Sequence, residues 1–156
     1  MRVANPPILI AAAVAMLAAL PAGAQPSAPA AASASVLTVA DAWVRATPGA
    51  DVAAAYMRLR NGGTQPIRVT GVRSALAGHA MIHETQLVAG VSTMRAHEPL
   101  VIAPGASVEL KPGGLHVMLQ ELAHPLAGYE EVPLELLLEG GGRVEVRARV
   151  RPLSAE

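Results

Sequence analysis

The 156-residue chain contains no cysteine and no phenylalanine, only 2% of its residues are aromatic, and its 12 Lys and Arg residues are balanced by 12 Asp and Glu residues. Without cysteine, the protein cannot form a disulfide, a thiolate zinc site, an iron–sulfur cluster or a blue-copper centre. The balanced charge argues against nucleic-acid binding, which needs a basic surface. The scarcity of aromatic rings also removes the platforms on which single strands stack.

The first 24 residues have the order of a secretory signal peptide. Arg2 precedes an apolar run over residues 8–20, and Pro21-Ala22-Gly23-Ala24 supplies the small residues before a cleavage site. The run is shorter than the roughly 20 residues that span a bilayer, and no cysteine follows it. We therefore expect a cleaved signal peptide, no membrane span, no lipid anchor and a periplasmic location.

The remaining chain is expected to hold one folded domain. Apart from Gln25, residues 25–35 are Ala, Pro and Ser, a composition that favours an extended linker. We expect a β-barrel domain over residues 36–152 and a short tail over residues 153–156. A domain of this size can bury its own core.

Short β-branched and alternating runs separated by turn signals predict an all-β fold. Their spacing indicates eight or nine strands in a Greek-key sandwich or barrel. We expect Asn61-Gly62-Gly63 to turn because Asn and Gly tolerate positive φ, residues 74–78 to form a loop or a short helical turn, and Trp43 to be the core aromatic residue. The candidate strands are residues 36–46, 53–60, 67–72, 81–87, 91–95, 100–102, 107–110, 115–122, 132–138 and 143–150.

The methionine and histidine residues of this domain cluster in one segment. Residues 79–118 contain Met81, Met94 and Met118 together with four of the five histidines, His79, His83, His97 and His116. Imidazole binds several transition metals, whereas thioether is a soft ligand that selects Cu(I). In an oxidising compartment a Met sulfur offers softness without the disulfide exchange open to a thiolate. The set therefore indicates a Cu(I) site.

Strand geometry can bring four of these donors together. His116 and Met118 are two residues apart in an extended run, so they project from one face. His83 precedes a turn-like segment and Met94 follows it, so a hairpin can bring this second pair together. The predicted metal ligands are His83, Met94, His116 and Met118.

The chain resembles the periplasmic copper chaperones called PCuAC. The intervals between the four donors, ten residues, twenty-one residues and one residue, are those of the family's His-x10-Met-x21-His-x-Met signature. The resemblance spans residues 39–150. Other similar segments are Ala42-Trp43-Val44-Arg45-Ala46-Thr47-Pro48, Ala54-Ala55-Tyr56-Met57, Asn61-Gly62-Gly63, His83-Glu84-Thr85 and Pro112-Gly113-Gly114-Leu115-His116-Val117-Met118-Leu119.

The resemblance implies a cupredoxin-like β-barrel that binds one Cu(I) through these four side chains at an exposed edge. It also implies that the protein carries copper toward the dinuclear copper site of cytochrome c oxidase subunit II, alongside a Sco-type protein. Some members add a Met- and His-rich tail that binds Cu(II). This chain ends in Arg-Pro-Leu-Ser-Ala-Glu, so we expect that second site to be absent.

Neighbouring residues have plainer expected roles. Met81 lies two residues before His83 and could act as an auxiliary sulfur. Glu84 or Thr85 could accept the free N–H of His83, and Met57 is expected to fill the core. His79, His97 and His124 are expected to be ordinary exposed histidines, of which His97 is the best placed to support the site.

Two other classes of function stay open at this stage. A non-metal envelope β-sandwich that acts as a protein-interaction or assembly module would tolerate Met94→Leu and Met118→Leu with only small packing losses. An enzyme, such as a copper oxidase or a hydrolase, is disfavoured because the sequence has no Ser-His-Asp motif, His-Glu-x-x-His motif or phosphate loop. The predicted function is carriage of Cu(I) by ligand exchange, without catalysis.

Overall fold

The computed structural model describes residues 36–152. The expected signal peptide, linker and tail, residues 1–24, 25–35 and 153–156, lie outside the described residues. No helix within the described range is long and apolar enough to cross a membrane. The strands are β1 (Leu37–Ala46), β2 (Ala53–Asn61), β3 (Ile67–Arg73), β4 (Ala77–Val88), β5 (Val91–Ala96), β6 (Leu100–Ile102), β7 (Ser107–Leu110), β8 (Leu115–Leu122), β9 (Glu131–Leu138) and β10 (Arg143–Pro152).

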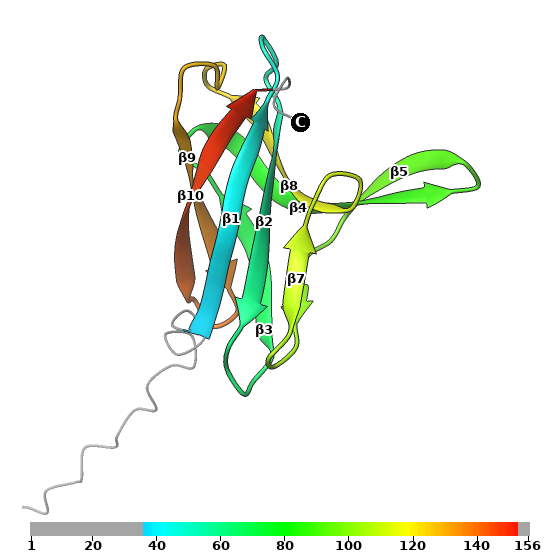
Figure 1. The fold of residues 1–156 in the computed structure, drawn as a ribbon, viewed down its shortest axis with the longest axis vertical. Coiled ribbons are helices and arrows are strands. Elements are labelled where there is room, and N and C mark those ends of the chain that lie inside the picture. Colours follow the sequence, from blue (N-terminus) through cyan, green and yellow to red (C-terminus); the bar gives the residue numbers. More distant parts are fainter. Residues whose placement is uncertain (1–35, 153–156) are drawn as a thin grey trace, which may run out of the picture.

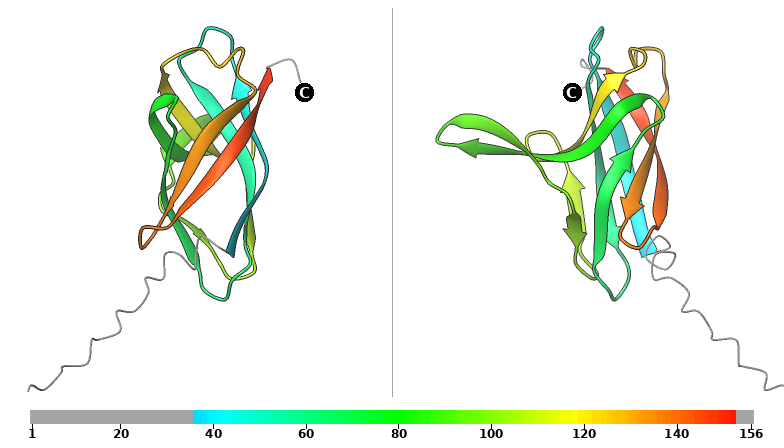
Figure 2. Two further views of the ribbon diagram at one scale, coloured as in Figure 1. Left: turned by 90° about the vertical axis from the view of Figure 1, so that its left-hand side faces the viewer. Right: turned by 180° about the vertical axis from the view of Figure 1, so that it is seen from behind.

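These strands form one hydrogen-bonded sheet that curls around a core (Figures 1 and 2). Their order is β5-β4-β8-β2-β1-β10-β9-β3-β6, with β7 paired to β2 beside β8. β1 and β10 run parallel. β3, near the far end of the order, also lies against β4, so the sheet encloses its apolar face. The predicted all-β Greek-key sandwich or barrel is confirmed.

The strand count and one boundary differ from expectation. All ten candidate ranges correspond to strands among the described residues, so the count of eight or nine was too low, and β4 begins at Ala77 where a loop or short helical turn was expected. Gly78 looked like a loop residue, but its neighbours Ala77 and His79 pair with β8, and a Cβ at Gly78 would collide with the side chain of Glu121. The glycine allows a close approach of two strands, so a loop was the wrong interpretation.

The core follows the expected alternation along β2. Ala55, Met57 and Leu59 are buried, whereas Arg58 and Arg60 are exposed. Met57 belongs to the main apolar cluster, so its predicted role as core filler is confirmed. Such burial is the dominant favourable term in folding.

Trp43 does not lie in the core, contrary to expectation. The register of β1 against β2 shifts between Ala40 and Trp43, and Asp41 has a φ of 53°. This bulge reverses the alternation, so Leu37 faces the core before it and Val44 after it. Trp43 is therefore turned to the outer face, where its ring packs against that of Tyr56 at a tilt of 38°, with centroids 4.5 Å apart.

Asn61 makes the expected turn for a different reason. Neither it nor the two following glycines has a positive φ. The Asn61 side chain is fully buried. Its Nδ2 donates to the carbonyls of Gln65 and Ile102, and its Oδ1 accepts the Gly63 N–H. Hydrogen bonding, and not left-handed backbone, fixes this turn.

Two features of the sheet position the candidate site: a projecting arm and a break between β7 and β8. β4 and β5 form an arm that projects from the body (Figures 1 and 2), closed by Ala89 and Gly90, both with positive φ, as a two-residue type I′ turn requires. The segment 111–114 separates β7 from β8, so β2 pairs with β7 along one half and with β8 along the other. The arm's base and β8 meet on the outer face.

Candidate metal centre

The cross-strand register places two imidazoles and two thioethers in a two-by-two array. His83 on β4 lies opposite His116 on β8, and Met81 lies opposite Met118. Residues opposite each other, and residues two apart on one strand, share a face. The adjacent pair, Ile82 and Val117, faces the other way and is fully buried in the core. The four donors therefore project together from the outer face of β4 and β8.

His116 is buried and held in one orientation. Its side chain is 5% exposed, and its Nδ1 lies 2.9 Å from the carbonyl oxygen of Gly114. Because a carbonyl only accepts, Nδ1 must carry the hydrogen, which leaves the lone pair of the neutral ring on Nε2. The same carbonyl accepts the Thr85 N–H at 3.1 Å. Segment 111–114 thus fixes the tautomer in which Nε2 can bind a metal.

His83 presents a nitrogen without a hydrogen-bond partner. Its Nδ1 is the buried side-chain polar atom of residues 36–152 that has no partner. Such atoms are rare in folded proteins and require an explanation. Burial, followed by the positive charge of a protonated His116, lowers the pKa of His83 below its usual 6.5, and Glu98 partly opposes the effect. The ring is therefore neutral at pH 7, as a metal ligand must be.

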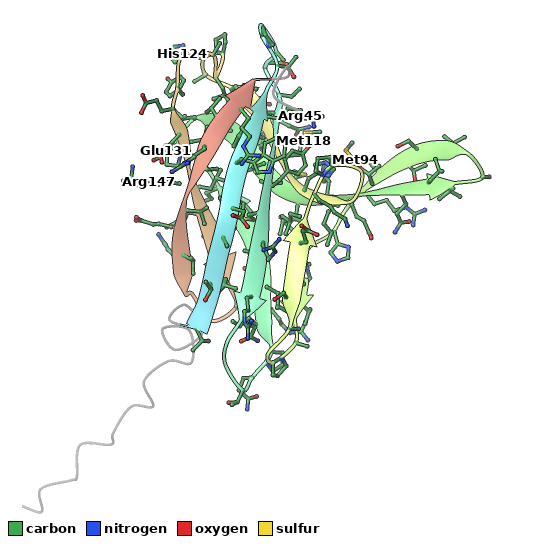
Figure 3. All side chains as sticks on the ribbon, in the orientation of Figure 1. Arg45, Met94, Met118, His124, Glu131 and Arg147 are labelled. Carbon is green, nitrogen blue, oxygen red and sulfur yellow. The ribbon has the colours of Figure 1, made fainter. Side chains whose placement is uncertain are left out.

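Met94 is the outermost of the expected donors. It lies opposite Thr85 on the arm, on the face that carries His83, and it is 51% exposed. Met94 is a diagonal neighbour of His83, whose direct partner on β5 is Ala96, and β4 lies between β5 and β8. Figure 3 shows Met94 and Met118 where the arm leaves the body, and His124 far from them at one end of the sandwich.

An aromatic pair covers the buried side of the array. The ring of Tyr56 lies 6.4 Å from that of His116, centroid to centroid, and it also packs against the ring of Trp43. Arg151 lies over the Trp43 ring at 4.9 Å. Burial raises the pKa of Tyr56, an effect that the charge of Arg45 opposes. The rings of His83 and His116 meet edge to face at 6.0 Å, so aromatic rings continue from Trp43 through Tyr56 to the two imidazoles.

Glu84, one of the two residues expected to orient His83, is placed otherwise. Glu84 does not accept from His83, because its Oε2 lies 3.3 Å from Nδ1 of His97. Residues on one strand alternate between faces, so Glu84 points away from the face of His83. The contacts that do support the site, the Gly114 carbonyl and the Tyr56 ring, were missed. The first is a backbone atom and carries no sequence signal, but Tyr56 could have been found in the segment 54–57 shared with the family.

Soft donors are needed to complete any metal site here. Within residues 36–152, no three His, Asp or Glu side chains are grouped closely enough to hold a metal ion. The remaining histidines lie elsewhere: His79 is exposed beside Glu121 at 3.6 Å, and His124 is exposed between β8 and β9. His97 was expected to be exposed, but it is half-buried beside Glu84. Two neutral imidazoles supplemented by thioethers match the preferences of Cu(I) and not those of Ca²⁺, Mg²⁺ or Zn²⁺.

Comparisons with known proteins agree with this description. The LpqE-like family model matches residues 37–150. A protein of Leifsonia xyli subsp. xyli, named "Putative lipoprotein Lxx21020", is 32% identical over 117 residues, which cover 74% of this chain and 70% of the relative.

Solved structures of similar fold carry copper-related names. The Cu(I) form of DR1885 from Deinococcus radiodurans is 31% identical, with a TM-score of 0.57 over 83% of this chain and 81% of that one. The copper-bound PCuAC domain from PmoF2 is 25% identical, with a TM-score of 0.62 over 75% of this chain and 93% of that one. The resemblance drawn from the sequence is thereby confirmed, and the chain belongs to the LpqE-like family of PCuAC-type domains with a cupredoxin-like β fold.

Proposed function

We propose that the protein is a Cu(I) chaperone that holds one copper ion through His83, Met94, His116 and Met118. The observation that carries the proposal is the pair of facing imidazoles on β4 and β8. One ring is fixed with its Nε2 lone pair free, and the other has a buried Nδ1 without a partner. An unpartnered buried nitrogen costs about 1–3 kcal/mol, and a cuprous ion would remove that cost.

The relatives support copper as the cargo. DR1885 is described in a Cu(I) form and the PmoF2 domain in a copper-bound form. Neither neighbour fixes the ligands of this chain, which we assign from its own register and burial. The neutral donors leave the copper with a single positive charge, and this charge is tolerated at the rim of the sheet better than inside it.

Release by ligand exchange follows from the unequal exposure of the donors. Met94 is half exposed, whereas His116 is buried. A thioether or imidazole of an acceptor can reach copper from the arm side and displace Met94 first. The buried imidazole then dissociates last, so copper is passed on without being freed. No bond other than metal–ligand bonds changes in this step, and copper remains Cu(I).

We further propose that the carrier works in the periplasm and that its acceptor is cytochrome c oxidase subunit II, with a Sco-type protein alongside. The signal-peptide pattern of residues 1–24 and the lipoprotein name of the Leifsonia relative support export. The acceptor rests on the family resemblance. Transfer of copper from the loaded chain to the apo copper domain of subunit II is the test of that part.

Copper stoichiometry under reducing conditions tests the chaperone proposal. Native mass spectrometry of the mature protein with Cu(I) should show one copper per chain. The His116→Ala/Met118→Ala variant should show none while retaining its β-sheet circular dichroism spectrum. His124→Ala, at an exposed histidine, is the matched control and should still bind one copper. A wild-type protein that binds no Cu(I) would contradict the proposal.

One observation favours a second candidate, a protein-interaction module. Leu87, Val88 and Val91 at the tip of the arm are 76%, 50% and 62% exposed. Three exposed aliphatic side chains at one tip are typical of an interaction surface. If the wild-type chain binds no copper, this candidate takes precedence.

A further inference from the structure

We propose that Met81 is a fifth copper donor, which takes the place of Met94 when that exposed side chain leaves the metal. This inference rests on the proposed function and deepens it. It predicts that the chain has two alternative thioether sets, Met94 with Met118 and Met81 with Met118, around the same two imidazoles. Copper can then lose its exposed sulfur without losing its coordination number.

The register is the first observation that supports this role. Met81 pairs directly with Met118 across β4 and β8, in the row next to His83 and His116. Opposite side chains have Cβ atoms about 4.5–5.5 Å apart, and an unbranched thioether with three rotatable bonds adapts its reach. Met81 and Met118 are direct cross-strand partners, whereas Met94 lies on β5, one strand further from β8.

Packing is the second observation, because it shows that Met81 does not fill the apolar core as a methionine ordinarily does. Met57 is a member of the buried core. Met81, Met94 and Met118 belong neither to that core nor to the partly buried residues that pack against it. Met81 is nevertheless half buried on the outer face. It therefore shares its environment with the two proposed ligands and not with the filler methionine.

Exposure determines which sulfur leaves and which stays. Met94 sits on the projecting arm and is 51% exposed, so an incoming protein meets it first. Met81 lies on the part of β4 that is paired to β8 within the body. In the exchange one copper–sulfur bond breaks as another forms, and neither a proton nor an electron moves.

Leucine substitutions at three methionines test the inference. Affinity for Cu(I) is measured by competition with a chromophoric Cu(I) chelator for Met94→Leu, Met94→Leu/Met81→Leu and Met94→Leu/Met57→Leu. We expect Met94→Leu to bind one Cu(I), the Met81 double variant to bind at least about tenfold more weakly than Met94→Leu, and the Met57 double variant to match Met94→Leu. Methionine-to-leucine changes conserve volume and cost less than about 1.5 kcal/mol of stability.

X-ray absorption of copper-loaded Met94→Leu gives a second readout that leaves Met81 in place. Two sulfur ligands are expected in that variant and one in the Met94→Leu/Met81→Leu variant. A single sulfur in Met94→Leu, or equal affinities of the two double variants, would overturn the role of Met81. Failure of the wild-type chain to bind Cu(I) would instead overturn the proposed function itself.

Discussion

Replacing His116 with Asn should separate copper binding from folding. The Asn amide can take the place of the imidazole Nδ1 and donate to the Gly114 carbonyl, which His116 now contacts at 2.9 Å. Nε2, the proposed copper ligand, is removed. The Gly114 carbonyl also keeps the Thr85 N–H, so the substitution leaves no buried acceptor without a partner.

Two free energies set the expected size of the effects. The smaller side chain leaves about 40 Å³, which at about 24 cal/mol per Å³ lowers the free energy of unfolding by about 1 kcal/mol. In a domain of this size that corresponds to a drop in Tm of about 3–6 °C. Cu(I) buffered at about 100 times its Kd should stabilise the wild-type chain by about 2.7 kcal/mol, which is about 8–16 °C. A hundredfold weaker affinity would leave only about 0.4 kcal/mol.

Differential scanning calorimetry of apo and Cu(I)-buffered samples measures both effects. His124→Asn is the matched control, because His124 is exposed between β8 and β9, and it should keep both the apo Tm and the full copper-dependent rise. His116→Asn should show a slightly lower apo Tm and almost no rise. A copper-dependent rise in His116→Asn equal to that of the wild type would refute the assignment of Nε2 as a ligand.

Three further predictions concern pH, the β2 turn and the outer face. The pKa of His83 lies below its unfolded value of 6.5, so the contribution of His83 to stability is complete above pH 6.5 and declines as the pH falls. The midpoint of its NMR titration should lie below 6.5. By pH 5.5 the protonation of His83 should weaken Cu(I) binding by less than the factor of about ten expected of an ordinary imidazole. A Cu(I) affinity that does not change at all between pH 7.5 and 5.5 would argue against two histidine ligands. Asn61→Ala should lower the free energy of unfolding by about 2–4 kcal/mol in chemical denaturation, since it leaves the groups bonded to this side chain unpaired; a loss below 0.5 kcal/mol or so would be inconsistent with those bonds. Arg151→Ala should lower the free energy of unfolding by about 0.5–1 kcal/mol, because it removes the contact with Trp43. The fluorescence of that single Trp follows the unfolding. The Cu(I) affinity should stay unchanged; a changed affinity would mean that this contact reaches the site.

The sequence predicted the strands well because alternation and turn residues are local signals. β6, β7 and β8 have the expected bounds, and Met57 is in the core as predicted. Trp43 was misplaced because its direction depends on a bulge at Asp41, which reverses the alternation. A bulge is set by pairing with a neighbouring strand, and the sequence of β1 alone does not reveal it.

Sequence spacing could name candidate donors but not their surroundings. It identified His83 and His116, which the structure brings opposite each other, and it placed Met94 beyond a hairpin turn. It could not provide the Gly114 carbonyl that orients His116, because every residue has such a carbonyl. Nor could it rank Met81 against Met94, since that comparison needs the cross-strand register and the packing of the outer face.

Copper K-edge X-ray absorption of the wild-type chain loaded with one Cu(I) measures the donor set itself. We expect two nitrogen and two sulfur ligands, with loss of one nitrogen or of binding itself in His116→Asn. A first shell of nitrogen or oxygen alone, with no sulfur, would contradict this donor set.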